Sequence, residues 1–376
     1  MNITFLVGNG FDIHMGLATA YSEVKSHYIK LEKDDLRLQA FQRSMSENGS
    51  YWSNFELALG QYTEKFQEDS QADYLFCLED FTEELIAYLQ IQEARIDYEL
   101  CAEEIQKEFI RSISEYIASI PNRSKKDLNA IIANNGGVVF RFASFNYTHI
   151  LDKCLQLSFG NDTIVGNHKM NGSIFTHTVN SEVLHIHGEL PGPIIMGVDN
   201  SSQIANRNWA GQRRFQQKIA KPEINTRAGS LVDDDLSRLI NGSNIICVYG
   251  MSLGETDKTW WKIIRSWLNG ADHRLILFGH NNNINRLESH QRQFTIQDEL
   301  VDRFLELAEV NGADRAIIES RIIPVINPNL FDINLVELTQ TKKVIDEFET
   351  KAHVEELSEE LEKRQKIAKL HGLLTK

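Results

Sequence analysis

The chain has 376 residues, of which 42% are hydrophobic and 24% are charged, an ordinary globular composition that can fill a substantial core. At roughly 150 residues per domain, this length allows two domains or one large domain that carries an insertion. With 22 glycines and only 6 prolines, the collagen-like and proline-rich disordered classes are excluded. A formal net charge of −14 disfavours a surface that tracks phosphates, so we do not expect nucleic acid as a partner.

The cysteines and the apolar segments argue against secretion and against a membrane span. The cysteines, at positions 77, 101, 154 and 247, contain no CxxC pair and predict neither a disulfide framework nor a cysteine zinc site. The N-terminal sequence lacks the basic and long apolar regions of a signal peptide, and no apolar run is long enough to cross a bilayer. We therefore expect a cytoplasmic protein with no membrane partner and no bound metal.

Apolar patterning predicts an α/β fold, a mostly parallel sheet with helices on both faces. Residues 3–7 (ITFLV) read as a buried strand, and a loop and a helix-like stretch follow through about residue 29. Further strands are predicted at Val138–Phe145, Val183–Ile186, Pro193–Met196, Asn244–Tyr249, Arg274–Phe278 and Arg321–Ile326. We assign residues 1–30 and 121–335 to this core, residues 31–120 to an inserted helical subdomain, and residues 336–376 to a C-terminal helical extension.

Polar or glycine-rich motifs follow several of these strands, where ligands bind in open parallel sheets. The first is the loop Gly8-Asn9-Gly10-Phe11-Asp12, whose glycines would let the backbone approach a phosphate at a helix N-terminus. The alternative is a plain tight turn. The full GxGxxG pattern is not met, because His14 lies near the third glycine position and the next glycine is Gly16.

The next two motifs place an amide and an imidazole at strand ends. Asn146, within SFNYT, is either a helix cap or a catalytic amide that holds a water or a ribose hydroxyl. In HIHG, His185 and His187 fall on one face of a strand. They are either a core and a surface histidine, or His187 is a general base with a pKa near neutrality. A metal pair has no third ligand that the spacing identifies.

The last motif, YGMSLGETD, satisfies the GxSxG pattern of serine hydrolases with Ser252 as nucleophile. Asp272 and His280 would follow in the order that such enzymes require. This alternative leaves the Gly8 loop and Asn146 without a role.

Taken in order, these motifs resemble the nucleotide site of sirtuins. The resemblance places Gly8, Gly10 and Gly16 in the nucleotide loop and assigns catalytic roles to Asn146 and His187. It places Gly250, Ser252 and Leu253 at the adenosine ribose, and it implies a Rossmann-like core. The chain has no four-cysteine zinc module, and Tyr21 and Ala18 replace the Arg and Pro of the sirtuin loop, which argues against protein deacylation.

Over most of its length the chain resembles the AbiH family of bacterial abortive-infection proteins. The shared segments are LVGNGFD, FNYT, HIHG, SLGETD and a YW..FE segment formed here by Tyr51, Trp52, Phe55 and Glu56. This resemblance implies a role in phage defence without supplying a reaction.

The two resemblances together predict an NAD glycohydrolase, with NAD as substrate and nicotinamide and ADP-ribose as products. Asn146 would orient the water or the ribose hydroxyls, His187 would accept the proton, and backbone N–H groups of Gly8–Asp12 would hold the pyrophosphate. Ser252 and Asp257 would contact the adenosine ribose. Asp12 and Asp199 either line the pocket or are turn residues, and Glu56 reaches the site only if the insertion folds over it.

Two alternatives stay open beside this prediction: a sensor that binds an ADP-ribose-like nucleotide without turnover, and the serine hydrolase that uses Ser252. A nuclease is disfavoured, because the spacing shows no carboxylate metal cluster. The expected partners are a small-molecule nucleotide, a phage-derived trigger and further copies of the chain in a homo-oligomer.

Overall fold

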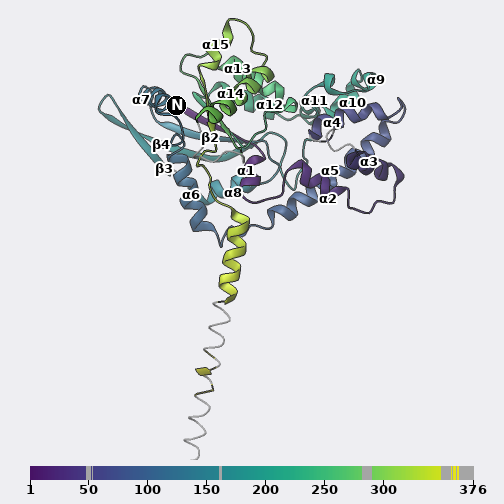
Figure 1. The fold of residues 1–376 in the computed structure, drawn as a ribbon, viewed down its shortest axis with the longest axis horizontal. Coiled ribbons are helices and arrows are strands. Elements are labelled where there is room, and N and C mark those ends of the chain that lie inside the picture. The colour runs from purple at the N-terminus through teal and green to yellow at the C-terminus, as the bar shows by residue number, and fades with distance from the viewer. Residues whose placement is uncertain are drawn as a thin grey trace, which may run out of the picture.

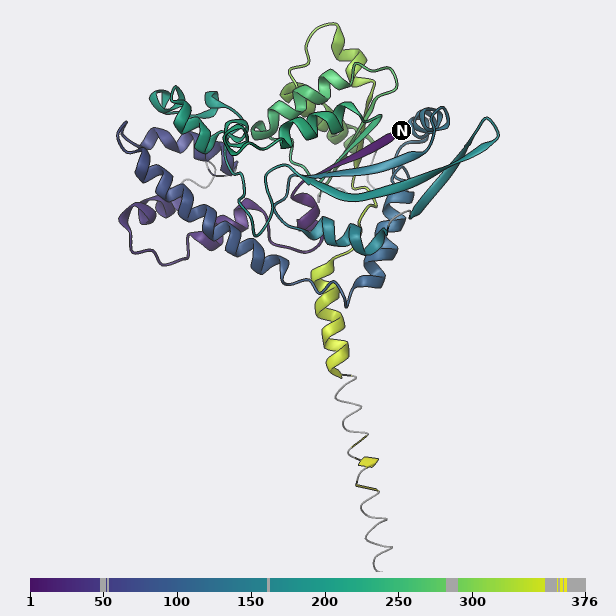
Figure 2. The ribbon, with the colours of Figure 1, turned by 180° about the vertical axis from the view of Figure 1, so that it is seen from behind.

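The computed structural model describes residues 1–47, 52, 54–160, 163–281, 290–348, 357, 359–360 and 362–363. Within these residues a seven-stranded sheet in the order β3-β4-β2-β1-β5-β6-β7 forms the centre of the molecule (Figures 1 and 2). All neighbouring strands pair in parallel except β3 and β4. The strands are β1 Asn2–Val7, β2 Val138–Ser144, β3 Ile164–Met170, β4 Ser173–His185, β5 Ile245–Tyr249, β6 Arg274–Gly279 and β7 Ile322–Ile326. The prediction of a mostly parallel α/β sheet is thus confirmed.

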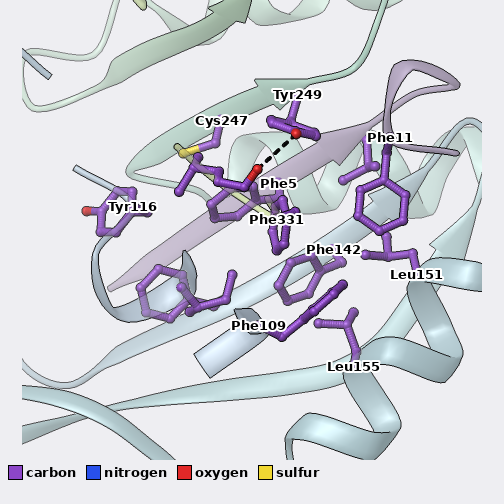
Figure 3. Close-up of a cluster of buried hydrophobic side chains, with 14 of the residues drawn as sticks. Phe5, Phe11, Phe109, Tyr116, Phe142, Leu151, Leu155, Cys247, Tyr249 and Phe331 are labelled. Carbon is purple, nitrogen blue, oxygen red and sulfur yellow. Dashed lines mark hydrogen bonds between the residues drawn. The ribbon is translucent and has the colours of Figure 1, made fainter. Parts of the chain in front are cut away.

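Side chains of β1 alternate between two hydrophobic cores, one on each face of the sheet. Phe5 and Val7 face the first core, and Leu6 faces the second. Figure 3 shows the first core, where Phe5 stacks on Phe142 with a centroid distance of 5.5 Å. This face is covered by α6 Ala102–Ser114, α7 Asn122–Ala133 and α8 Ile150–Ser158. The opposite face is covered by α12 Val232–Asn241, α13 Lys258–Trp267, α14 His290–Leu307 and α15 Asp314–Glu319.

A third core holds together a helical body beside the sheet (Figure 1). Its centre is aromatic, and the rings of Phe55 and Phe81 stack at 4.3 Å between centroids. The body contains α2 Tyr21–Tyr28, α3 Leu36–Glu47, α4 Phe55–Tyr62, α5 Gln71–Glu93, α9 Arg207–Ala210, α10 Arg213–Ile219 and α11 Lys221–Ala228. The short helix α1 Gly10–His14 follows β1, and short 3₁₀ turns lie at η2 Thr63–Lys65, η3 Ser201–Gln203 and η4 Glu255–Asp257.

The three cores divide the chain differently from the sequence-based segments. Helix α6, within the predicted insertion 31–120, packs on the sheet, whereas α2 and α9–α11, outside that insertion, join the helical body. The two parts of the helical body are therefore more than 100 residues apart in sequence, and apolar spacing alone cannot connect such segments.

The predicted C-terminal extension begins as a helix at residue 335 and is described as helix through residue 348. Val336 N donates to Met15 O at 3.2 Å and anchors the start of this helix, which then leads away from the body (Figure 1). Most of residues 349–376 lie outside the described residues. Among the described helices, none combines the length and the apolarity needed to cross a membrane.

One strand prediction is contradicted by the structure, and one hairpin was not predicted. The prediction of a strand at Pro193–Met196 is wrong: the segment is irregular, because Pro193 lacks an N–H for a ladder and Met196 packs into the helical body. The antiparallel hairpin of β3 and the first half of β4 was not predicted. It turns at Asn171 and Gly172, which have positive φ values of 52° and 83°.

The register of the parallel strands brings the motifs to one edge of the sheet. Val7 pairs with both Ser144 and Tyr249, and Ser144 pairs in turn with His185. The residues that follow these strands therefore emerge side by side. Strands β2 and β4 lie on one side of β1, and strands β5, β6 and β7 lie on its other side. This reversal of the strand order opens a crevice beyond the carboxyl ends of β1 and β5.

Candidate functional site

A cavity of about 360 Å³ lies at this edge, between the strand ends and the helical body. Of the residues predicted from the motifs, those that line it are Gly8, Asn9, Asp12, Asn146, His187, Ser252, Leu253 and Asp257. Residues from four separate loops, each following a different strand, thus meet around one space. Gly10, Phe11, Gly16 and Gly250, for which cofactor contacts were predicted, do not line it.

The backbone of the first loop is largely occupied by contacts within the protein. Gly8 N donates to Tyr249 O at 2.9 Å, and Gly10 N donates to Gly250 O at 2.7 Å. Phe11 N donates to Gly8 O at 2.9 Å. These three N–H groups are therefore not free to hold a pyrophosphate in the way that the sequence suggested.

The glycines of this loop are required by close contact with the loop after β5. A Cβ on Gly10 would lie 2.7 Å from the Cα of Gly250, and a Cβ on Gly250 would lie 2.5 Å from the backbone nitrogen of Phe11. Gly250 also has a φ of 68°, a conformation that favours glycine. Gly16 has a φ of 94° and abuts Asn334, and the Phe11 ring points into the first core (Figure 3).

Asn146 is held in one orientation by two acceptors. Its Nδ2 donates to Asp12 Oδ1 at 2.8 Å and to Gly8 O at 3.2 Å. Asn146 is 5% exposed, and its Oδ1 has no hydrogen-bond partner among the described residues. A helix cap would use this oxygen to accept a backbone N–H, so the cap interpretation does not account for the side chain. An unpaired buried acceptor in a cavity wall is suited to a ligand hydroxyl or a water.

Asp12 is the buried acid behind Asn146. Thr148 Oγ1 donates to its second carboxylate oxygen at 2.6 Å. Burial raises the pKa of Asp12 to about 7, although the hydrogen bonds from Thr148 and Asn146 oppose the shift. Asp12 is thus a cavity residue rather than a turn residue.

His187 enters the cavity from the loop after β4. It is 6% exposed, its ring lies edge-on to Phe145, and its Nε2 is 3.6 Å from Asp257 Oδ1. Burial and the positive charge of Lys221 lower the pKa of His187 to about 3, despite Asp257. The imidazole is therefore neutral at physiological pH. It is a weaker base than a histidine with the near-neutral pKa that the sequence predicted.

The helical body contributes a buried ion cluster that joins Glu56 and Asp257, both found in motifs, to Lys221, which no motif revealed. Asn54 caps α4 by accepting from Leu57 N at 3.3 Å, and this start places Glu56 in the first turn, at the cavity wall. Lys221 Nζ lies 2.7 Å from Glu56 Oε2 and 3.3 Å from Asp257 Oδ1. Burial lowers the pKa of Lys221, but Asp257 and Glu56 outweigh burial and hold it above its ordinary value.

Two tyrosines extend this cluster. Tyr21 Oη donates to Glu56 Oε1 at 3.3 Å and lies 3.4 Å from Tyr147 Oη. Tyr147 Oη also donates to the backbone oxygen of Ile195 at 3.4 Å. Both tyrosines line the cavity, so Tyr21 and Tyr147 form part of the same wall as Glu56.

The remaining side of the cavity is formed by the loop after β5 and by α14. Ser252 and Leu253 line it, and Arg303 from α14 donates through Nε to Leu253 O at 3.2 Å. Arg303 also lies 3.4 Å from Glu255, and its side chain is 38% exposed. No motif pointed to Arg303, because an arginine on a helix surface carries no specific signal.

Several other predicted positions lie apart from this cavity. Asp199 accepts from Thr259 N at 3.2 Å and lines a smaller neighbouring cavity of about 210 Å³ that shares His187. Asp272 precedes β6 and His280 follows it, so they lie at opposite ends of this strand and cannot complete a triad with Ser252. Tyr51 lies outside the described residues.

The comparison with known families gives one match. A family model described as Bacteriophage abortive infection AbiH matches residues 4–303, from β1 to α14. All of the cavity-lining residues fall within this match. None of the curated proteins compared with the chain matches it.

Proposed function

The chain belongs to the bacteriophage abortive infection AbiH family, and on this premise we propose that it hydrolyses NAD to nicotinamide and ADP-ribose, depleting the infected cell. The sheet topology supports a nucleotide ligand. Counted along the chain, the parallel strands lie in the order 3-2-1-4-5-6, the order of Rossmann dinucleotide-binding folds, and the cavity lies at the reversal point.

One observation carries the proposal: Asn146 lines the cavity with its amide fixed, and its buried Oδ1 has no hydrogen-bond partner among the described residues. Asp12 and Gly8 both accept from Nδ2, so the carbonyl side of the amide is left for the ligand. A ribose hydroxyl or a water molecule donates to such an oxygen and is thereby positioned for reaction.

The charge distribution around the cavity favours one orientation of the dinucleotide. Asp12, Glu56 and Asp257 line the cavity together with Asn146 and His187, and three carboxyl groups against the one ammonium of Lys221 would favour the cationic nicotinamide ring there. Arg303 lies beside Leu253, where it would meet the negative pyrophosphate. In this arrangement the phosphates depend on a side chain, since the N–H groups of Gly8 and Gly10 have internal partners.

The reaction requires little acid–base work from the protein. The bond between C1′ and the nicotinamide nitrogen breaks, its electron pair leaves with the ring, and the cationic pyridinium becomes neutral nicotinamide. The oxygen of a water bonds to C1′, and the surplus proton passes to the neutral ring of His187 and then to solvent. Water that has added to an oxocarbenium carbon is strongly acidic, so a base with a pKa of about 3 is adequate.

Two other functions remain as alternatives. A sensor that binds an ADP-ribose-like nucleotide without turnover would use the same cavity, and the absence of turnover would distinguish it. A serine hydrolase would need Ser252 as nucleophile, but neither Asp272 nor His280 lines the cavity with Ser252.

The direct test is release of nicotinamide from NAD by the purified protein, alone and in extracts of phage-infected cells. Asn146→Ala and His187→Ala are each expected to abolish release, while Ser252→Ala retains turnover and raises KM through the lost contact with the adenosine ribose. Turnover that survives in both of the first two variants would remove these residues from the mechanism. ADP-ribose binding without release in either setting would favour the sensor.

A further inference from the structure

A second cluster of ligating side chains lies under the loop that carries Asn146, outside the cavity. His149 precedes α8 and Asp152 lies in its first turn, while His185 ends β4 and Glu189 follows in the next loop. The register of β2 and β4 places these two segments side by side, because Ser144 pairs with His185. We propose that His149, His185 and Glu189, whose donor atoms all lie within 4.8 Å of one another, form a zinc-binding site, with Asp152 beside His185.

The separations of the donor atoms match a metal coordination shell. His149 Nε2 lies 3.2 Å from Glu189 Oε2, and His185 Nε2 lies 3.7 Å from the same oxygen. Asp152 Oδ2 is 3.0 Å from His185 Nε2. Ligand atoms in a tetrahedral zinc shell with bonds of roughly 2.0–2.1 Å are separated by about 3.3 Å. One zinc ion can therefore reach the donor atoms of His149, His185 and Glu189 with small side-chain adjustments.

The second nitrogen of His185 supports the ligand assignment. His185 Nδ1 lies 3.2 Å from the backbone oxygen of Asn146, which can only accept a hydrogen bond. Nδ1 therefore donates to this carbonyl, and a zinc ion would take the place of the proton that Nε2 shares with Asp152 at 3.0 Å in the metal-free protein. Metal-binding histidines commonly have this arrangement, with the outer N–H on a carbonyl or a carboxylate.

The chemistry of the donors favours zinc over calcium or magnesium. Two imidazoles with carboxylates are a typical zinc set, whereas the harder cations prefer oxygen ligands alone. Two carboxylates also neutralise the charge of a divalent ion. The imidazoles are partly shielded, with side-chain exposures of 28% for His149 and 7% for His185, so the site is reachable from solvent yet anchored in the fold.

Spacing in the sequence paired His185 with His187 and offered no third ligand. In the structure the two rings serve different sites: His187 lines the cavity, and His185 lies with His149. The zinc site would brace the Phe145–Thr148 loop through the carbonyl of Asn146. It does not depend on the proposed NAD chemistry.

The test is titration of metal-stripped protein with zinc by calorimetry, with cobalt absorption as a second readout of tetrahedral N/O coordination. One zinc per chain is expected. Glu189→Gln, at an exposed position, and His149→Ala should each weaken binding by roughly 10–100-fold or more, because even outer-shell changes have effects of this size. Far-ultraviolet circular dichroism establishes that both variants are folded.

The matched control is His177→Ala. This histidine belongs to a separate pair, with His168 Nδ1 2.9 Å from His177 Nε2 in the β3–β4 hairpin. His177→Ala should bind zinc as the wild type does. The proposal is overturned if the wild type binds no zinc, or if Glu189→Gln and His149→Ala bind it with unchanged affinity. The cluster would then consist of two histidines that pair with carboxylates and hold no metal.

Discussion

The ammonium group of Lys221 lies 2.7 Å from the carboxylate of Glu56, although the two residues are 165 positions apart. Both side chains are buried, and the pair joins α11 to α4 behind the cavity. Asp257 Oδ1, in the segment after β5, lies 3.3 Å from the same ammonium nitrogen. This cluster therefore connects the helical body to the strand ends that form the site.

Lys221→Met is expected to lower the free energy of unfolding by about 3–5 kcal/mol, because it leaves buried carboxylates without a cation. Urea denaturation at neutral pH measures the change. The double variant Lys221→Met with Glu56→Gln should recover part of the loss. Lys218→Met, at an exposed position on α10, is the control and should leave stability nearly unchanged. Equal effects of the two lysine substitutions would contradict the assignment.

Gly250→Ala tests the contact between the first loop and the loop after β5. The new Cβ would lie 2.5 Å from Phe11 N at a φ of 68°, and backbone strain alone costs about 1–3 kcal/mol. Thermal unfolding should show the loss. Gly160→Ala, where a Cβ meets nothing within 4 Å, is the control. A Gly250→Ala protein as stable as this control would show that the two loops do not touch as described.

The raised pKa of Asp12 leads us to expect a particular dependence of the free energy of unfolding on pH. Its pKa is raised from 3.8 to about 7 by burial, so the folded state binds the proton more tightly than the unfolded state. Its contribution is fully present below pH 3.8, falls as the pH rises, and is lost above about pH 7. A shift of this size corresponds to at most about 4 kcal/mol.

Asp12→Asn retains the shape and removes this titration. The difference in unfolding free energy between wild type and Asp12→Asn should therefore shift in favour of the variant between pH 4 and pH 7. Urea denaturation across this interval measures the difference. The contributions of the other carboxyl groups cancel, because both proteins contain them. A difference that stays constant with pH would mean that Asp12 is not protonated preferentially in the fold.

Arg303→Gln tests the phosphate end of the proposed orientation. Loss of one charged hydrogen bond should weaken ADP-ribose binding by roughly 10–100-fold, corresponding to about 1.5–3 kcal/mol. Binding of nicotinamide riboside, which has no pyrophosphate, should change little. Arg315→Gln on α15, whose partner is Asp302 outside the cavity, is the matched control. Equal weakening for both ligands would place the pyrophosphate elsewhere.

Sequence patterns were sufficient for the parts of the fold where local and global signals agree. The apolar run 3–7 became β1, and the motifs at its end and at the ends of β2, β4 and β5 meet because parallel register aligns strand ends. The β3–β4 hairpin escaped because its side chains are mostly polar or exposed, although the Asn171-Gly172 pair is a strong turn signal.

The cavity was harder to anticipate because its other wall comes from distant segments. Lys221 and Arg303 lie on ordinary helices with no motif, and only the tertiary fold brings them to Glu56 and Leu253. The glycines at positions 10 and 250 are indeed required, but by the close approach of two loops and not by a bound phosphate. A sequence records that a Cβ is absent, and it does not record whether a phosphate or a neighbouring loop occupies the space.

The most direct test of the nucleotide cavity is a crystal structure of the protein soaked with ADP-ribose, which requires neither turnover nor a phage trigger. We predict density in the cavity beyond β1 and β5, with the terminal ribose at Asn146 Oδ1 and the pyrophosphate at Arg303. Density at another surface, or an empty cavity at saturating ligand, would contradict the account.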